Sequence, residues 1–198
     1  MNLTALRSLV RTDLGDTSAA AYRWEDDTLD RHLLRAAAEY SLTAPQQLSI
    51  TLDTIAGSRV VDITSIEDRV NIESVEYPVA LEPRALRRFN TWGQRLTVED
   101  GAVPDGQPLS ICYGAPHLLD ETGTTIPAVH HEIVVAGAAA YAAIEWAAFA
   151  VNRVNSGEDA AGGYFRWGSA RLATFQSELK RLHWNNGVRI GKLFNAEM

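Results

Sequence analysis

The sequence has little of what points directly to a class of function. It holds one cysteine, Cys112, which excludes an internal disulfide framework and any metal site built from several cysteines. It has no excess of basic residues, because 18 lysines and arginines stand against 25 acidic residues, a formal net charge of −7. A chain of this charge repels phosphates and is a poor general binder of nucleic acid.

Signals for targeting are missing as well. Residues 1–7 lack the basic start and apolar core of a targeting peptide. The most apolar stretch, Ile133 to Val151, has the length of a membrane span, but it carries Glu145 near its middle and is largely alanine. A carboxylate in lipid is costly, so we expect a buried helix, no membrane partner and a cytoplasmic location during synthesis.

Three short stretches are partly similar to known catalytic or binding motifs, but none of them completes the motif. After His130-His131-Glu132, the helix of a zinc protease would need a histidine where Val135 stands. Gly162-Gly163 lacks the lysine and hydroxyl residue that complete a phosphate loop. Cys112 and His117 do not make a nucleophilic pair without further geometry. We therefore predict no catalytic, cofactor-binding or metal-binding residues, and no enzyme.

The composition that is present is typical of a globular chain, and the first segments predict two helices. Hydrophobic residues make up 46% and charged residues 22% of 198 positions, which suits one domain. Apolar side chains recur every three or four residues from Leu3 to Leu14, and Gly15 is a typical helix stop. A second helix is expected from about Trp24, capped by Asp26 or Asp27, to just before Pro45.

The period then changes to two, which predicts strands. Residues 48–63 suggest a hairpin around a turn at 56–58. Further strands are expected at 71–77, 96–98 and 109–113, separated by Asp-Gly turns. Residues 47–118 therefore predict a small β subdomain of about five strands.

Helical patterning returns after Pro127. The longest candidate runs from Ala128 to Asn155 and contains ten alanines, which allow close helix packing. A loop is expected over 156–163, then a last helix over 164–182 with an apolar side made of Phe165, Leu172, Phe175, Leu179 and Leu182. Trp146 and Trp167 are expected in the core, and Asn185-Asn186-Gly187 should end the helix.

Together these elements predict an α+β fold, mainly α, with a four-helix bundle-like core and a small β subdomain inserted between the second and third helices. We expect a single domain over 1–198. Its helical core would cover 1–46 and 127–184, its β insertion 47–126 and its C-terminal tail 185–198.

Charge is uneven along the chain. Residues 160–198 contain six basic and two acidic residues, whereas residues 16–159 hold ten basic and twenty-two acidic ones. Two interpretations stay open: a solvated last helix, or a basic C-terminal part that docks on an acidic partner surface.

Three stretches together resemble the head-to-tail connector (adaptor) proteins of tailed bacteriophages. They are residues 6–16 with 22–33 (LRSLVRTDLGD and YRWEDDTLDRHL), residues 75–78 (VEYP), and residues 126–132 leading into 137–142 (IPAVHHE and GAAAYA). The resemblance covers most of the chain. It is carried by packing and capping patterns and involves no chemical motif.

The resemblance implies a structural virion protein of the neck. Such adaptors form a ring, usually of twelve copies, under the portal; the ring extends the DNA channel and carries the next neck or tail protein. DNA would pass through without specific binding, and an acidic wall suits that passage. Residues for portal docking are then expected in the C-terminal tail: Arg189, Ile190, Lys192, Leu193 and Phe194. Residues for tight packing within and between subunits are expected in the alanine-rich helix: Ala139, Ala143 and Trp146.

Two alternatives remain at this point. The chain could be another neck or tail component, such as a stopper or tail-end protein, or an enzyme of a type that no motif reveals. Assembly with a portal would favour the adaptor, and turnover of a substrate would favour the enzyme.

Overall fold

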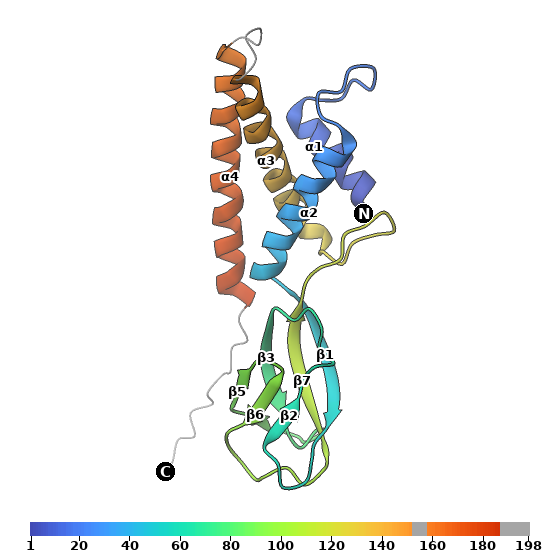
Figure 1. Ribbon diagram of the computed structural model, residues 1–198, viewed down its shortest axis with the longest axis vertical. Helices are drawn as coiled ribbons and strands as arrows, with labels where there is room; N and C mark the ends of the chain where they lie inside the picture. The colour runs from blue at the N-terminus through green and yellow to red at the C-terminus, as the bar shows by residue number, and fades with distance from the viewer. Residues whose placement is uncertain (152–157, 187–198) are drawn as a thin grey trace.

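A computed structural model of the chain describes residues 1–151 and 158–186. Within these residues the fold is α+β, as predicted, with four α-helices and two antiparallel sheets (Figure 1). The helices are α1 (Leu3–Leu14), α2 (Asp26–Thr43), α3 (His131–Val151) and α4 (Glu158–Asn186), with a short 3-10 turn η1 (Ala128–His130) before α3. The strands are β1 (Gln46–Asp53), β2 (Val60–Asp62), β3 (Asn71–Glu76), β4 (Leu86–Arg87), β5 (Phe89–Trp92), β6 (Arg95–Val98) and β7 (Pro108–Ala115).

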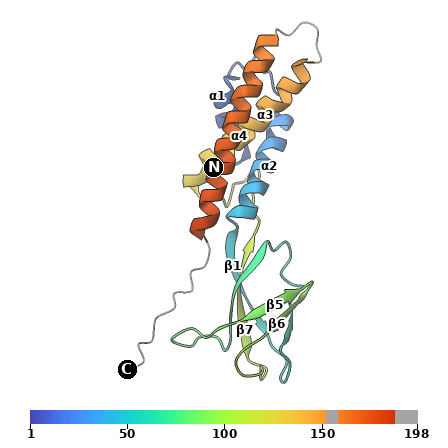
Figure 2. The same ribbon diagram turned by 90° about the vertical axis from the view of Figure 1, so that its left-hand side faces the viewer.

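The molecule is elongated, with its helices at one end and its strands at the other (Figures 1 and 2). The chain leaves the helices through β1, directly after α2, and returns to them after β7. Each end has its own apolar cluster of buried side chains. One cluster lies among the four helices, and the other lies between the two sheets.

The first helix forms as the apolar stripe predicts. Leu3, Leu6, Val10 and Leu14 are buried, and Gly15 ends the helix at φ 66°, where glycine avoids the strain of a side chain. The capping prediction for the second helix was wrong. Glu25 occupies the cap position without a side-chain hydrogen bond, because Asp26 is already helical and its carboxylate binds Arg7 and Arg11.

The predicted hairpin over 48–63 was also wrong, although both strands exist. β1 pairs along all eight residues with β7, and β2 pairs with β6 in the other sheet. The sheet orders are β1-β7-β3-β4 and β2-β6-β5. A long partner satisfies more of the backbone groups of β1 than the three residues of β2 could, and sequence period carries no information about which partner is chosen.

The α3–α4 pair corrects two further predictions. Gly162 and Gly163 lie inside α4, where a loop was expected. Helix propensity is a weak preference, and packing against α3 overrides it. Phe165 and Trp167 were expected to face the core but are 55% and 36% exposed.

The buried face of α4 explains the second of these errors. It is formed by Ala161, Gly168, Phe175 and Leu182, at a spacing of seven, together with Leu179. At Gly168 an added Cβ would lie 3.0 Å from the carbonyl oxygen of Ala140 and 2.9 Å from Cγ1 of Ile144. Small residues at the contact bring the two helices close, and the large aromatic residues nearby point elsewhere.

Candidate functional site: surfaces for assembly

The alanine-rich helix is the centre of the helical end. α3 packs against α1, α2 and α4, and the side chains of Ala139 and Ala143 are fully buried within the chain. Trp146, one turn further along, is half-buried. The three residues proposed for subunit packing therefore already make contacts inside one copy of the chain.

Trp146 belongs to an aromatic cluster that joins three elements. Its ring lies 4.8 Å from that of Tyr164 on α4 and 6.3 Å from that of Trp24, which precedes α2. The indole nitrogen of Trp24 donates a hydrogen bond to the carbonyl of Ala142. The guanidinium of Arg23 lies over the Trp146 ring at 4.7 Å and donates to the hydroxyl of Tyr164. This cluster fixes the start of α2 against α3 and α4.

A buried ion pair holds the connection between α1 and α2. Arg11 donates to the Asp16 carboxylate at 2.6 Å, to the Trp24 carbonyl at 2.9 Å and to Asp26 at 2.6 Å. Asp16 also accepts from the backbone amides of Arg23 and Trp24. The hydrogen bond from Arg11 is the largest of the effects that lower the pKa of Asp26. The network is structural, because donors and acceptors on both sides are satisfied within the chain.

His32 is a buried ionisable group with few partners among the described residues. Its side chain is 3% exposed, and neither ring nitrogen has a hydrogen-bond partner in the described chain. Burial lowers the pKa of His32, while Glu145, with a carboxylate oxygen 3.3 Å from Nε2, acts in the opposite direction. The ring stacks on Tyr141, whose pKa is raised to about 12 by burial and by its hydrogen bond to Glu39.

A cleft of about 600 Å³ lies where the helices meet the strands. In its wall the hydroxyl of Tyr40 lies 2.6 Å from Nδ1 of His130. His117 contacts the carbonyl of Ala44 through Nε2 and the hydroxyl of Thr125 through Nδ1. Burial lowers the pKa of His117 and raises that of Tyr40. These hydrogen bonds join the end of α2 to the segment that returns from β7.

The motif residues of the sequence do not come together into a reaction centre. His131 is buried, with Nε2 at 3.0 Å from the carbonyl of Ile126. Cys112 is a half-buried residue of β7 between Ser49 and Ser74 of the neighbouring strands. Over residues 1–151 and 158–186, no three side chains of His, Cys, Asp or Glu form a group that could hold a metal ion.

The residues proposed for portal docking, Arg189, Ile190, Lys192, Leu193 and Phe194, lie outside the described residues. The last described helix, α4, ends at Asn186, near the strands (Figure 1).

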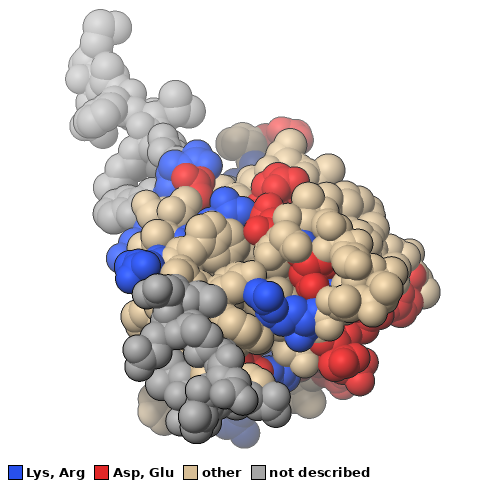
Figure 3. Space-filling model, turned by 90° about the horizontal axis from the view of Figure 1, so that it is seen from above, with Lys and Arg blue, Asp and Glu red and all other residues tan. Residues whose placement is uncertain are grey.

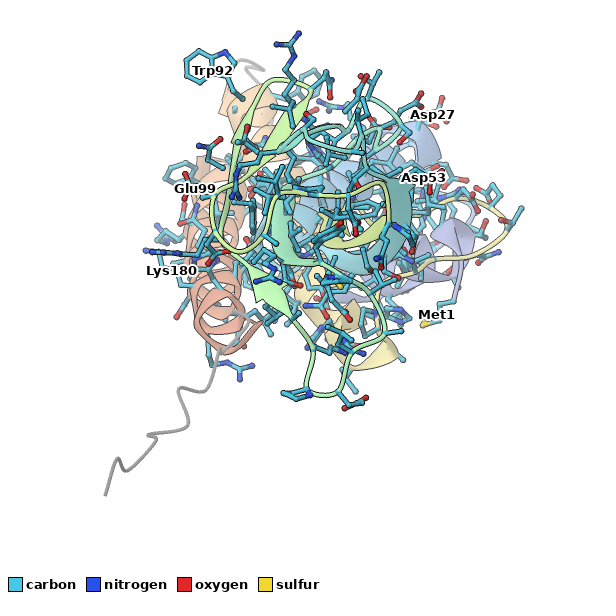
Figure 4. All side chains as sticks on the ribbon, turned by 90° about the horizontal axis from the view of Figure 1, so that it is seen from below. Met1, Asp27, Asp53, Trp92, Glu99 and Lys180 are labelled. Atoms are coloured by element: carbon cyan, nitrogen blue, oxygen red, sulfur yellow. The ribbon has the colours of Figure 1, made fainter. Side chains whose placement is uncertain are left out.

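Two features of the surface could not be placed in space from the sequence. Trp92 is 87% exposed at the tip of the β5–β6 hairpin and projects away from the molecule (Figure 4). The turn is held by Arg69, which donates to the Gly93 carbonyl and the Gln94 side chain. The second is the charge of the helical end, where basic residues predominate on one side and acidic residues on the other, with both kinds between them (Figure 3).

The segment from Ala128 to Ala150 is long and apolar enough to cross a membrane, and 61% of its most apolar window is buried inside the chain. Burial against three other helices is equally what a core helix shows, so length and composition alone do not assign a location.

No protein-family model matches this chain, and a search of curated proteins finds no match either. The sequence analysis missed Arg11 and His32, although a signal was present. Both are polar residues on a face of buried apolar neighbours, Val10 and Leu14 for the first, Leu29 and Leu33 for the second. A polar residue in such a position is buried with a partner or at a cost.

Proposed function

We propose that this chain is a structural virion protein, the head-to-tail adaptor of a tailed bacteriophage. Its copies form a ring, of twelve copies in the family that the chain resembles, and the ring binds under the portal. The ring extends the DNA channel and supports the next neck or tail protein, whether a stopper, a tail tube or a terminator protein. In this proposal the protein is located in the virion neck and, during assembly, in the host cytoplasm.

The observation that carries this proposal is the two-ended shape with two separate apolar cores. A connector must bind one neighbour at each end, and each end here has its own apolar cluster. In this proposal a four-helix bundle-like core supports one end, and a β subdomain inserted between α2 and α3 supports the other. We assign the C-terminal residues 188–194 to the portal. Trp92, exposed at the tip of a firmly held hairpin, offers a further contact for a neighbour.

Binding to isolated phage heads tests the proposal. The purified protein is incubated with DNA-filled, tail-less heads that bear the portal, and the bound copies are counted by mass measurement and by imaging of the neck. We expect a monomer in solution and a closed ring on the portal. Binding only to heads that already carry an adaptor would instead identify a stopper, and absence of binding to either kind of head would reject a neck role.

A further inference from the structure

The outer face of α4 is basic and carries exposed aromatic side chains. Between residues 161 and 183 the helix has four basic residues and one acidic residue, Glu178. Arg171 pairs with Asp13 and Arg181 with Glu178, but Arg166 and Lys180 have no ion-pair partner among the described residues. Phe165 and Trp167, beside Arg166, are exposed. The outer face of α4 therefore offers two cations that are unpaired within the described chain, and exposed aromatic area, to a binding partner.

An acidic surface lies around the start of α2 and the loop before η1. Arg7 binds Asp26 and Asp30 at 2.7 Å and Glu121 at 3.2 Å, so these carboxylates surround one guanidinium. Beside them, Glu25 and Asp27 are exposed, and neither has an ion pair within the described part of the chain. The carboxylates of this surface outnumber its cations; they are Glu25, Asp26, Asp27, Asp30, Asp120 and Glu121.

The two surfaces lie on opposite sides of the molecule. Seen along the long axis, Asp27 and Lys180 project to opposite sides (Figure 4). In the view from the other end, basic side chains predominate on one side and acidic ones on the other, with both kinds between them (Figure 3). One copy therefore cannot bring its own two surfaces together, whereas two copies placed side by side can.

We propose that the outer face of α4 binds the acidic surface at the start of α2 on a second copy of this chain. Each copy then uses one surface toward each of its two neighbours, which is the head-to-tail contact that closes into a ring. Like surfaces repel, so the charges disfavour a two-fold dimer and set the direction of the contact. The inference rests on the ring of the proposed function and names the two surfaces that build it.

Charge reversal on each surface, alone and together, tests this contact. Arg166→Glu with Lys180→Glu reverses the α4 face, and Glu25→Lys with Asp27→Lys reverses the acidic surface. None of these four residues has an ion pair in the described chain, so the fold should be kept. We expect each pair of changes to lower the number of copies on portal-bearing heads at least tenfold, and the four changes together to restore assembly.

The matched control carries the same change of charge on the strand end. Arg84→Glu with Arg95→Glu gives the net charge of the α4 variant and should assemble like the wild type. The four-fold variant has the wild-type net charge, so its recovery cannot come from a change of overall repulsion. Helix content and melting temperature show whether each variant folds; if the reversal pairs unfold, Arg166→Gln with Lys180→Gln takes their place with a smaller expected loss.

The outcomes separate the two proposals. If the wild type forms no ring on heads, the proposed function fails. If the wild type assembles and both reversal pairs assemble as well as it does, the ring stands and these surfaces are not its contacts. If the α4 reversal abolishes binding to duplex DNA and leaves ring formation unchanged, the face serves nucleic acid and the inference is overturned.

Discussion

The pH dependence of the stability of the helical end depends on single buried residues. His32 is a residue of α2 whose ring faces Tyr141 and Glu145 of α3. Neither ring nitrogen has a hydrogen bond within the described chain. Arg31 is the main cause of a lowered pKa at Glu145, through its hydrogen bonds to that carboxylate. Arg31 and Arg35 both oppose protonation of the imidazole. Burial of the imidazole therefore favours its neutral form, and the two arginines act in the same direction.

The pH dependence of stability follows from the direction of this shift. Because burial lowers the pKa of His32, the unfolded chain binds more protons than the folded chain once the pH falls below about 6.5. Stability is then lost as the pH is lowered from about 7 toward 5. His117, whose pKa is also lowered by burial, acts in the same direction.

We predict that His32→Phe makes stability less dependent on pH. Phenylalanine keeps the stacking on Tyr141 and removes two ring nitrogens that have no hydrogen-bond partner, so the change at pH 7 should stay within about 1.5 kcal/mol. Chemical denaturation at several pH values between 5 and 7 measures the effect. The variant should lose less stability than the wild type over this range, with the remainder due to His117. Parallel profiles for the two proteins would show that His32 does not titrate as described.

At the scale of elements, the contact between α3 and α4 organises the helical end. Ala139 and Ala143 are fully buried, and the Cβ of Ala143 would lie 3.2 Å from a Cβ added at Gly168. The interior of a folded protein is close-packed, so little room is left between these two helices for a larger side chain. The alanine content of α3 thus sets the distance between helices.

We predict that Ala139→Leu and Ala143→Leu each destabilise the chain by about 1–3 kcal/mol and weaken ring formation, because the added atoms overpack a close contact. Thermal or chemical unfolding gives the stability, and binding to heads gives the assembly. Ala38→Leu on the exposed side of α2 adds the same atoms without a neighbour to displace. Equal stability of the buried and exposed variants would place α3 outside the core.

Strand pairing shows the limit of prediction at this scale. The alternation in residues 48–52, 71–77 and 109–113 located β1, β3 and β7, because one half-buried face produces a period of two. The short β4 and β5 were not found, since two to four residues hold too little pattern. The partner of β1 lies more than fifty residues away, so local sequence could not reveal it.

At the scale of the whole molecule, charge and shape suggest how copies assemble. The net charge of −7 is not spread evenly, since α4 carries mainly basic residues and the start of α2 mainly acidic ones. Basic side chains predominate on one side of the helical end and acidic ones on the other (Figure 3). The same separation was visible in the sequence as a basic C-terminal part. Only the fold shows that the opposite charges lie on opposite sides.

We predict that deleting residues 188–198 leaves a folded chain of near-normal helix content but abolishes attachment to filled heads. The two apolar clusters are built from residues between Leu3 and Leu182, and the resemblance to adaptors assigns the deleted segment to the portal. Circular dichroism measures folding, and the yield of tailed particles measures attachment. Normal yield would refute a docking role, and loss of folding would mean that the tail packs on its own subunit.

Point changes separate the apolar from the charged part of this segment. Leu193→Ala with Phe194→Ala should weaken attachment more than Lys192→Ala, because buried apolar anchors dominate most interfaces. The reverse order would make the tail an electrostatic contact, and its binding would then fall steeply with salt.

Helices α1, α2 and α3, the longer strands and the α+β class could be read from local pattern, because periodicity and stop signals act over a few residues. The long-range contacts could not. Pairing of β1 with β7, the burial of Arg11 with Asp16, the exposure of Phe165 and Trp167, and the helical state of Gly162 and Gly163 depend on segments distant in sequence. Packing free energy summed over such contacts exceeds the local preference of any one residue, so these features appear only once the chain is folded.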